Sequence, residues 1–126
     1  AEKILNTLHD KAGDTVWSQR IMLEKARLWS EREDADGVDK IMHWLIGHEH
    51  TLYSQDLLLI AAHMQTKQGA VSTARQTLAG VVPENLTPEL RGDYWRTHAQ
   101  INIGLQRWHI AAAAWEQLAK LTQGEE

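Results

Sequence analysis

The chain has 126 residues, enough for one domain, and its 13 basic and 17 acidic residues give a net charge of −4. Such a balance argues against a dedicated nucleic-acid surface, which needs an excess or a stripe of basic residues. The absence of cysteine excludes disulfide bonds and thiolate zinc sites. No apolar run approaches the roughly 18 residues of a membrane-spanning helix, so we expect no membrane span. The absence of cysteine is compatible with the cytoplasm and with the periplasm and does not decide between them.

Apolar residues recur at every third or fourth position along the chain, which predicts an all-α fold of about seven helices. Gly47 and Gly69 are expected to end helices, and Thr87 followed by Pro88 is expected to start one. In chain order, the predicted helices cover about residues 1–9, 15–32, 38–47, 52–66, 71–78, 88–104 and 108–121.

A small or β-branched residue returns at nearly constant spacing within this pattern. Ala1, Val38, Ala74 and Ala111 are separated by 37, 36 and 37 residues. A period of this length is typical of a helical repeat array, in which each unit buries its apolar face by stacking on the next. Because the turns are short, consecutive helices must pack antiparallel. We therefore predict one domain, with a half repeat at 1–12 and repeats at about 14–49, 50–86 and 87–122.

Aligning the repeats on one another predicts which residues are buried. One position in the first helix of each repeat is always alanine, and larger residues precede it by four positions. In the second helix, large residues follow the repeat position by four and seven. Trp29, Trp95, Trp108 and Trp115 all fall on predicted core positions. The aligned sets are Ala26, Ala62 and Ala99; Met22, Leu58 and Trp95; Met42, Leu78 and Trp115; and Leu45, Val81 and Leu118.

This pattern resembles the tetratricopeptide repeat family, and the resemblance covers almost the whole chain. It is carried in the last repeat by Trp95, Ala99, Trp108, Ala111 and Trp115, and in the middle repeat by Leu58, Ala62, Gly69, Val71, Ala74 and Leu78. The first repeat departs from the family, with Glu33 where glycine is usual and Val38 where alanine is usual. The resemblance implies a right-handed superhelical α-solenoid. Because the period exceeds the usual 34 residues, a related solenoid of helical hairpins stays an alternative.

The resemblance also implies where a partner binds. In that family the first helices line a concave groove that holds a protein segment. One subclass grips a C-terminal carboxylate with lysine and asparagine, whereas this chain has Arg27, His63 and Gln100 at the matching positions, which argues against that activity. The implied groove residues are Arg20, Leu23, Arg27, Asp56, Leu59, His63, Asp93, Arg96 and Gln100.

A second, narrower resemblance lies in the middle of the chain. The run Ala74-Arg75-Gln76-Thr77-Leu78-Ala79, followed by Pro83, Leu86 and Tyr94-Trp95, is similar to the helical N-terminal domain of LpoA-type lipoproteins. Those proteins activate peptidoglycan synthases, so this resemblance implies a role in a bacterial envelope complex.

Two short motifs invite a metal-binding interpretation, and both fail on spacing. His48-Glu49-His50, with His43 nearby, lacks the separation that places two histidines on one helical face, and it supplies too few converging ligands for zinc. Asp34-Ala35-Asp36-Gly37 resembles part of a calcium loop, but alignment on the glycine puts Arg32 at the first ligand position. We therefore expect connectors there and no metal.

No phosphate-binding glycine-rich loop or nucleophile elbow occurs in the chain. We therefore predict a non-catalytic, cofactor-free scaffold or adaptor that binds a protein or peptide. The alternative is a structural spacer or dimerisation module of a larger protein, and a metal-dependent hydrolase is a remote third.

The two ends of the array carry apolar residues without a predicted neighbour, namely Ala1, Leu5 and Leu8 at the start and Trp115 and Leu118 near the end. The chain also starts inside an apolar pattern and without an initiator methionine. We therefore expect a fragment of a longer protein, or self-association through the terminal helices.

Overall fold

The computed structural model describes residues 16–48 and 53–122, and this part of the chain is entirely helical, without β-strands. The all-α prediction is therefore confirmed. The predicted helix at 1–9 lies outside the described residues, which contain six α-helices and one short 3₁₀-helix. These are α2 (Val16–Glu31), α3 (Gly37–Ile46), α4 (Ser54–Lys67), α5 (Val71–Leu78), η1 (Pro83–Asn85), α6 (Pro88–Gly104) and α7 (Trp108–Thr122).

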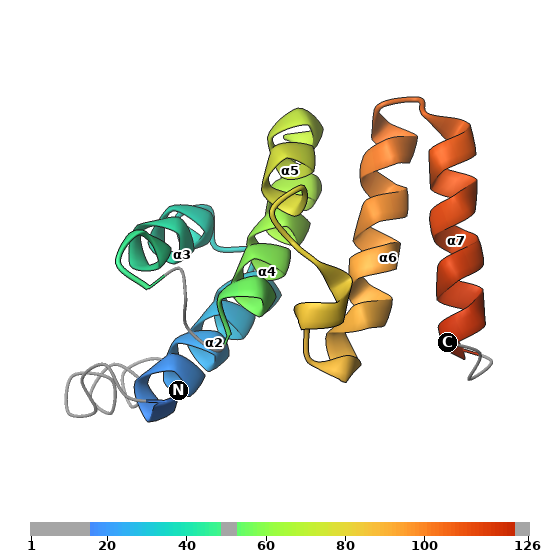
Figure 1. The fold of residues 1–126 in the computed structure, drawn as a ribbon. Coiled ribbons are helices and arrows are strands. Elements are labelled where there is room, and N and C mark those ends of the chain that lie inside the picture. Colours follow the sequence, from blue (N-terminus) through green and yellow to red (C-terminus); the bar gives the residue numbers. More distant parts are fainter. Residues whose placement is uncertain (1–15, 49–52, 123–126) are drawn as a thin grey trace.

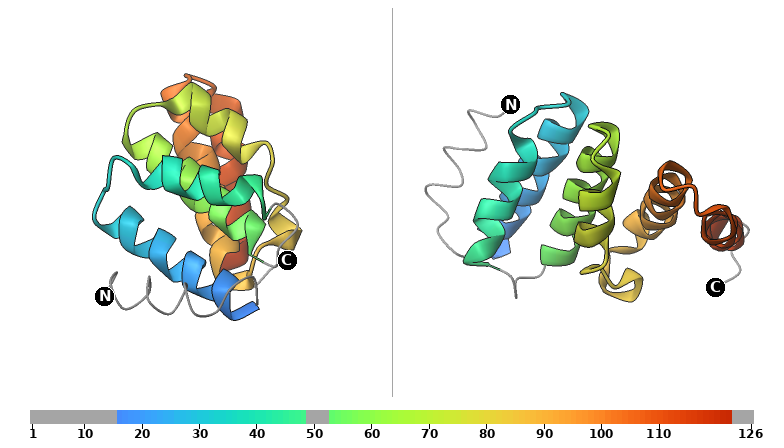
Figure 2. Two further views of the ribbon diagram at one scale, coloured as in Figure 1. Left: turned by 90° about the vertical axis from the view of Figure 1, so that its left-hand side faces the viewer. Right: turned by 90° about the horizontal axis from the view of Figure 1, so that it is seen from above.

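The three hairpins α2/α3, α4/α5 and α6/α7 follow one another in space in the order of the chain (Figures 1 and 2). Helix α2 packs against α3 and α4, and α4 in turn packs against α3, α5 and α6. Helix α6 packs against α5 on one side and against α7 on the other. The central helix α4 therefore connects the two ends of the row, and α7 forms the last element of the described part.

Turn chemistry sets the ends of the helices as the sequence predicts. Helix α3 stops at Ile46, immediately before Gly47, and Gly69 follows α4 with a φ of +83° that glycine adopts without strain. Helix α6 begins at Pro88 after Thr87, whose side chain makes no capping hydrogen bond. Before α3, the Asp36 backbone N–H donates to Asp34 Oδ1 at 2.9 Å, so this aspartate pair forms a turn.

The alanine positions of the repeat are buried as predicted. Ala26, Ala62 and Ala99 have no exposed surface, and Ala74 and Ala111 are buried as well. Alanine at these depths lets neighbouring helices approach closely, and larger apolar residues fill the space around the contact. Two clusters form in this way, one around α2, α3 and α4 and the other between α4, α5 and α6.

Part of the predicted core is wrong. Trp108 is 60% exposed, Trp115 is 41% exposed, and Met42 is also exposed, whereas Trp29 is buried and Trp95 is partly buried. The reason is the position of each helix in the row. Among the described residues α7 packs mainly against α6. Ala111 and Ala114 of α7 are buried there, whereas Trp108 and Trp115 lie beside this contact and stay partly exposed.

Candidate functional site: a groove across alternate helices

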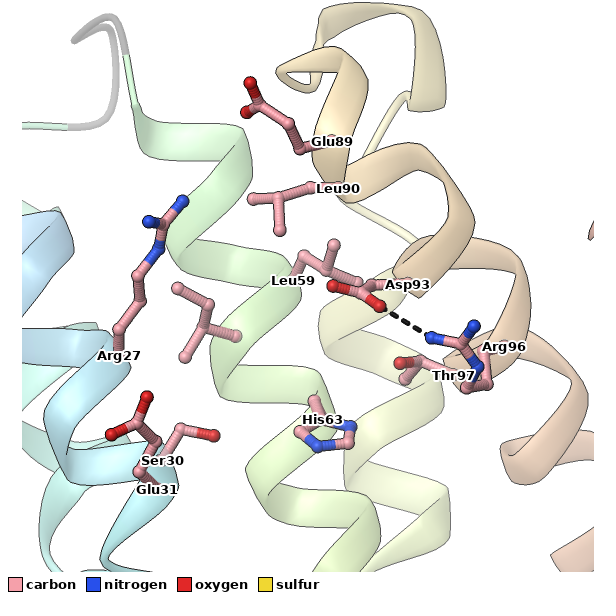
Figure 3. Close-up of a pocket in the computed structure, with 11 residues that line it drawn as sticks. Arg27, Ser30, Glu31, Leu59, His63, Glu89, Leu90, Asp93, Arg96 and Thr97 are labelled. Atoms are coloured by element: carbon pink, nitrogen blue, oxygen red, sulfur yellow. Dashed lines mark hydrogen bonds and ion pairs between the residues drawn. The ribbon is translucent and has the colours of Figure 1, made fainter. Parts of the chain in front are cut away.

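A hollow with a volume of about 520 Å³ runs across three hairpins of the described part of the chain. Only α2, α4 and α6 line it, so the first helix of every hairpin contributes and the second helices do not. Figure 3 shows the side chains converging from these three helices. We call this hollow the groove; its lining residues are Arg27, Ser30, Glu31, Leu59, Ile60, His63, Glu89, Leu90, Asp93, Arg96 and Thr97.

The floor of the groove is apolar. Leu59 and Ile60 on α4 are buried, and Leu90 on α6 is partly buried beside them. Figure 3 shows Leu59 and Leu90 in the gap between α4 and α6. A floor of this kind favours an apolar side chain of a ligand over water.

Charged groups of both signs surround that floor. Arg96 Nη1 donates to Asp93 Oδ1 at 2.7 Å, one turn away on α6. Arg27 Nη1 lies 3.4 Å from Glu24 Oε1 on α2. Glu31 and Glu89 add two more carboxylates to the lining. The arginines therefore have acidic neighbours already, and the groove carries no strong excess of either charge.

His63 lies half-buried among these charges. Desolvation lowers the pKa of its imidazole most, and the positive charges of Lys67 and Arg96 lower it further, while Asp93 acts in the opposite direction. The ring is therefore neutral at neutral pH, when it can both donate and accept a hydrogen bond.

The nine residues implied by the family resemblance divide into three groups. Five of them line the groove. Arg20 and Gln100 are exposed outside it, with Arg20 over the ring of Tyr53 and 3.4 Å from Glu24. Leu23 and Asp56 are buried, so their assignment as partner contacts is corrected. The five lining residues are Arg27, Leu59, His63, Asp93 and Arg96.

Asp56 is an internal connection between helices, with 1% of its surface exposed. Its Oδ1 accepts a hydrogen bond from the Thr87 backbone N–H at 3.1 Å. The carboxyl of α4 therefore satisfies a backbone donor at the start of α6, where the N-terminal residues have no intrahelical acceptor. Burial raises the pKa of this carboxyl, against the effects of Thr87 and Arg27.

The sequence interpretation missed six residues that line the groove. The helical spacing of three or four residues could have identified most of them. Residues three or four positions apart share a face of a helix, so the neighbours of Arg27, Asp56 and Asp93 at that spacing belong to the same surface. The missed residues are Ser30, Glu31, Ile60, Glu89, Leu90 and Thr97.

The histidine motif after α3 makes local contacts where it is described. The His48 ring stacks on Trp44 with centroids 4.0 Å apart, and its Nδ1 lies 2.7 Å from the Trp44 carbonyl oxygen. Glu49 and His50 lie outside the described residues. Within residues 16–48 and 53–122, no group of three or more potential ligands gathers in a way that could hold a metal ion.

Comparison of the chain with protein-family models, with curated proteins and with solved structures finds no match. None of the helices in the described ranges combines the length and apolar character needed to cross a membrane.

Proposed function

We propose that this domain is a non-catalytic scaffold that binds a segment of a partner protein in the groove. The helical row is, in this proposal, a right-handed tetratricopeptide-like solenoid. One observation carries the proposal: the groove is lined by α2, α4 and α6 alone. These are the first helices of the hairpins, which bind partners in the resembled family.

The composition of the groove supports a peptide ligand. A peptide offers apolar side chains for Leu59, Ile60 and Leu90, together with polar groups for the charged surroundings. An extended or helical segment can also contact three successive helices at once.

The exposed ion pair between Arg96 and Asp93 can open to let a ligand contact either side chain. Arg96 and Asp93 are both about half exposed, and such pairs contribute only about 0–1 kcal/mol to stability. A peptide carboxylate can therefore replace Asp93 as the partner of Arg96 at little cost. The same peptide can use a basic side chain to contact Glu31 or Glu89.

Selection from a random peptide display library, followed by affinity measurement with the synthesised peptides, tests this proposal. We expect the double variant Arg27→Glu/Arg96→Glu to bind selected peptides about tenfold or more weakly, because two charge-assisted contacts become repulsive. Lys120→Glu on α7 is the matched control, since Lys120 is exposed outside the groove. Equal affinity of the parent and the double variant would show that the groove is not the binding surface.

The similarity to LpoA-type lipoproteins extends the proposal to assembly or regulation of a bacterial envelope complex. The parent protein and its partner are then expected in the same compartment. Binding of the domain to an isolated envelope protein, with the same loss in the double variant, would support this extension.

A second candidate function is self-association through α7. Four exposed apolar residues share one face of this helix: Trp108, Ala112, Trp115 and Ala119. In an antiparallel pair of α7 helices, Trp108 would lie opposite Ala119 and Trp115 opposite Ala112, so each large side chain meets a small one. Sedimentation at several concentrations tests this: Trp115→Glu is expected to abolish a dimer, and a parent monomer at all concentrations would exclude it.

A further inference from the structure

A second hollow, of about 300 Å³, lies between α5, α6 and α7. It shares no lining residue with the groove, because α6 contributes a different face to each. We call it the α5–α7 pocket. Its volume is at the lower end of the range for small-molecule sites, roughly 300–1,000 Å³.

The charges of the α5–α7 pocket differ from those of the groove. Arg75 on α5 and Arg107 before α7 line it, and no carboxylate does. Within the described part of the chain, neither guanidinium makes an ion pair or a side-chain hydrogen bond. The positive charge of Arg107 acts on His98 inside the pocket. Burial is the larger cause that lowers the pKa of the His98 imidazole, and the charge of Arg107 lowers this pKa further.

Two neutral polar groups complete the pocket. Burial raises the pKa of Tyr94, and the nearby charge of Glu84 outside the pocket raises it too, so the phenol keeps its proton and can donate. Asn102 is 4% exposed; its Nδ2 donates to the His98 carbonyl oxygen at 2.8 Å, while its Oδ1 accepts no hydrogen bond among the described residues. A buried acceptor without a donor is costly, and a ligand N–H or O–H would satisfy it.

We propose that the α5–α7 pocket binds a small organic oxyanion, a carboxylate or a phosphate ester, that carries an apolar group and an adjacent hydrogen-bond donor. Arg75 and Arg107 hold the anion, and Tyr94 donates to it. The donor of the ligand reaches Asn102 Oδ1, while the apolar group packs against Leu78 and Ile101, which are both buried. This site is independent of the peptide groove.

Titration of the domain with N-acetylphenylalanine and with N-benzoyl phosphoethanolamine, each of which carries an amide N–H and a phenyl group, tests the proposal and separates the two anion types. N-acetylphenylalanine amide is the matched neutral control. We expect one or both anions to bind at millimolar concentration or better, about tenfold more tightly than the amide. Binding should also raise the pKa of His98, followed by NMR of its ring protons, because a nearby negative charge favours the imidazolium.

Variants of the two arginines decide whether the anion sits in this pocket. Arg75→Gln/Arg107→Gln should weaken anion binding about tenfold or more and remove the shift of His98, whereas Arg96→Gln in the groove should change neither. Arg75 is exposed, so Arg75→Gln alone, checked by circular dichroism, keeps the test valid if the double variant unfolds. The proposal is overturned if neither anion binds, if the amide binds equally well, or if the arginine variants leave the affinity unchanged.

Discussion

Two tryptophans that the repeat pattern places in the core, one at each end of the helical row, differ in their burial. Trp29 near the end of α2 is 4% exposed and belongs to the cluster formed with α3 and α4, whereas Trp115 on α7 is 41% exposed. Both occupy core positions of the repeat pattern. The repeat pattern therefore predicts the direction in which a side chain points from its helix. Burial of that side chain also requires a neighbouring helix that covers it.

The largest expected effect contrasts these two tryptophans directly. Trp29→Ala removes a buried indole and leaves a cavity, so we expect a loss of about 3–5 kcal/mol in the free energy of unfolding. Trp115→Ala should cost about 1 kcal/mol or less, since surface substitutions have small effects. Urea unfolding followed by circular dichroism measures both. Equal losses at the two sites would contradict the account of burial by neighbouring helices.

A second prediction compares two glycines, Gly37 in α3 near one end of the helical row and Gly92 in α6 near the other. A Cβ at Gly37, the first residue of α3, would lie 2.5 Å from Met64 Cε and 3.0 Å from Trp29 Cβ. The methionine can move but the tryptophan Cβ is fixed to its backbone, so Gly37→Ala should destabilise the protein by about 1–3 kcal/mol.

Gly92 inside α6 is the control for this close approach. A Cβ there would meet only Leu118 Cδ1 at 3.5 Å, an ordinary contact. Gly92→Ala should therefore stabilise by up to about 1 kcal/mol through helix propensity. The same unfolding experiment checks the pair, and a stabilising Gly37→Ala would mean that α2, α3 and α4 are packed less tightly than described.

The third and smallest expected effect on stability concerns the hydrogen bond between Asp56 on α4 and the Thr87 backbone N–H at the start of α6. Burial raises the pKa of Asp56 in the folded state, so its contribution to stability is complete below the unfolded pKa and is lost as the pH rises through the folded pKa. Asp56→Asn keeps an acceptor for the Thr87 N–H without a buried charge. We expect the variant and the parent to be similarly stable in acid and the variant to be modestly more stable at neutral pH.

Unfolding midpoints across this pH range measure the effect. Asp39→Asn, at an exposed position on α3, serves as the control and should show no such gain at neutral pH. A neutral-pH loss of stability in Asp56→Asn would show that the ionised carboxylate stabilises the start of α6 more than its burial costs.

Periodicity and turn residues were enough to predict the all-α class, the ends of α6 at Pro88 and Gly104, and the burial of Ala26, Ala62 and Ala99. These properties depend on local sequence and on the phase of each helix. The same pattern could not tell that Leu23 and Asp56 are buried, because the pattern does not describe how α2, α4 and α6 approach one another.

The most direct test of the central proposal is a map of amide chemical-shift changes when a selected peptide is titrated into the labelled domain. The account predicts that the changes gather on α2, α4 and α6 around Arg27, His63 and Asp93, and that they disappear in the Arg27→Glu/Arg96→Glu variant. Changes confined to α3, α5 and α7, or changes that persist in that variant, would contradict the proposal that the groove binds the partner.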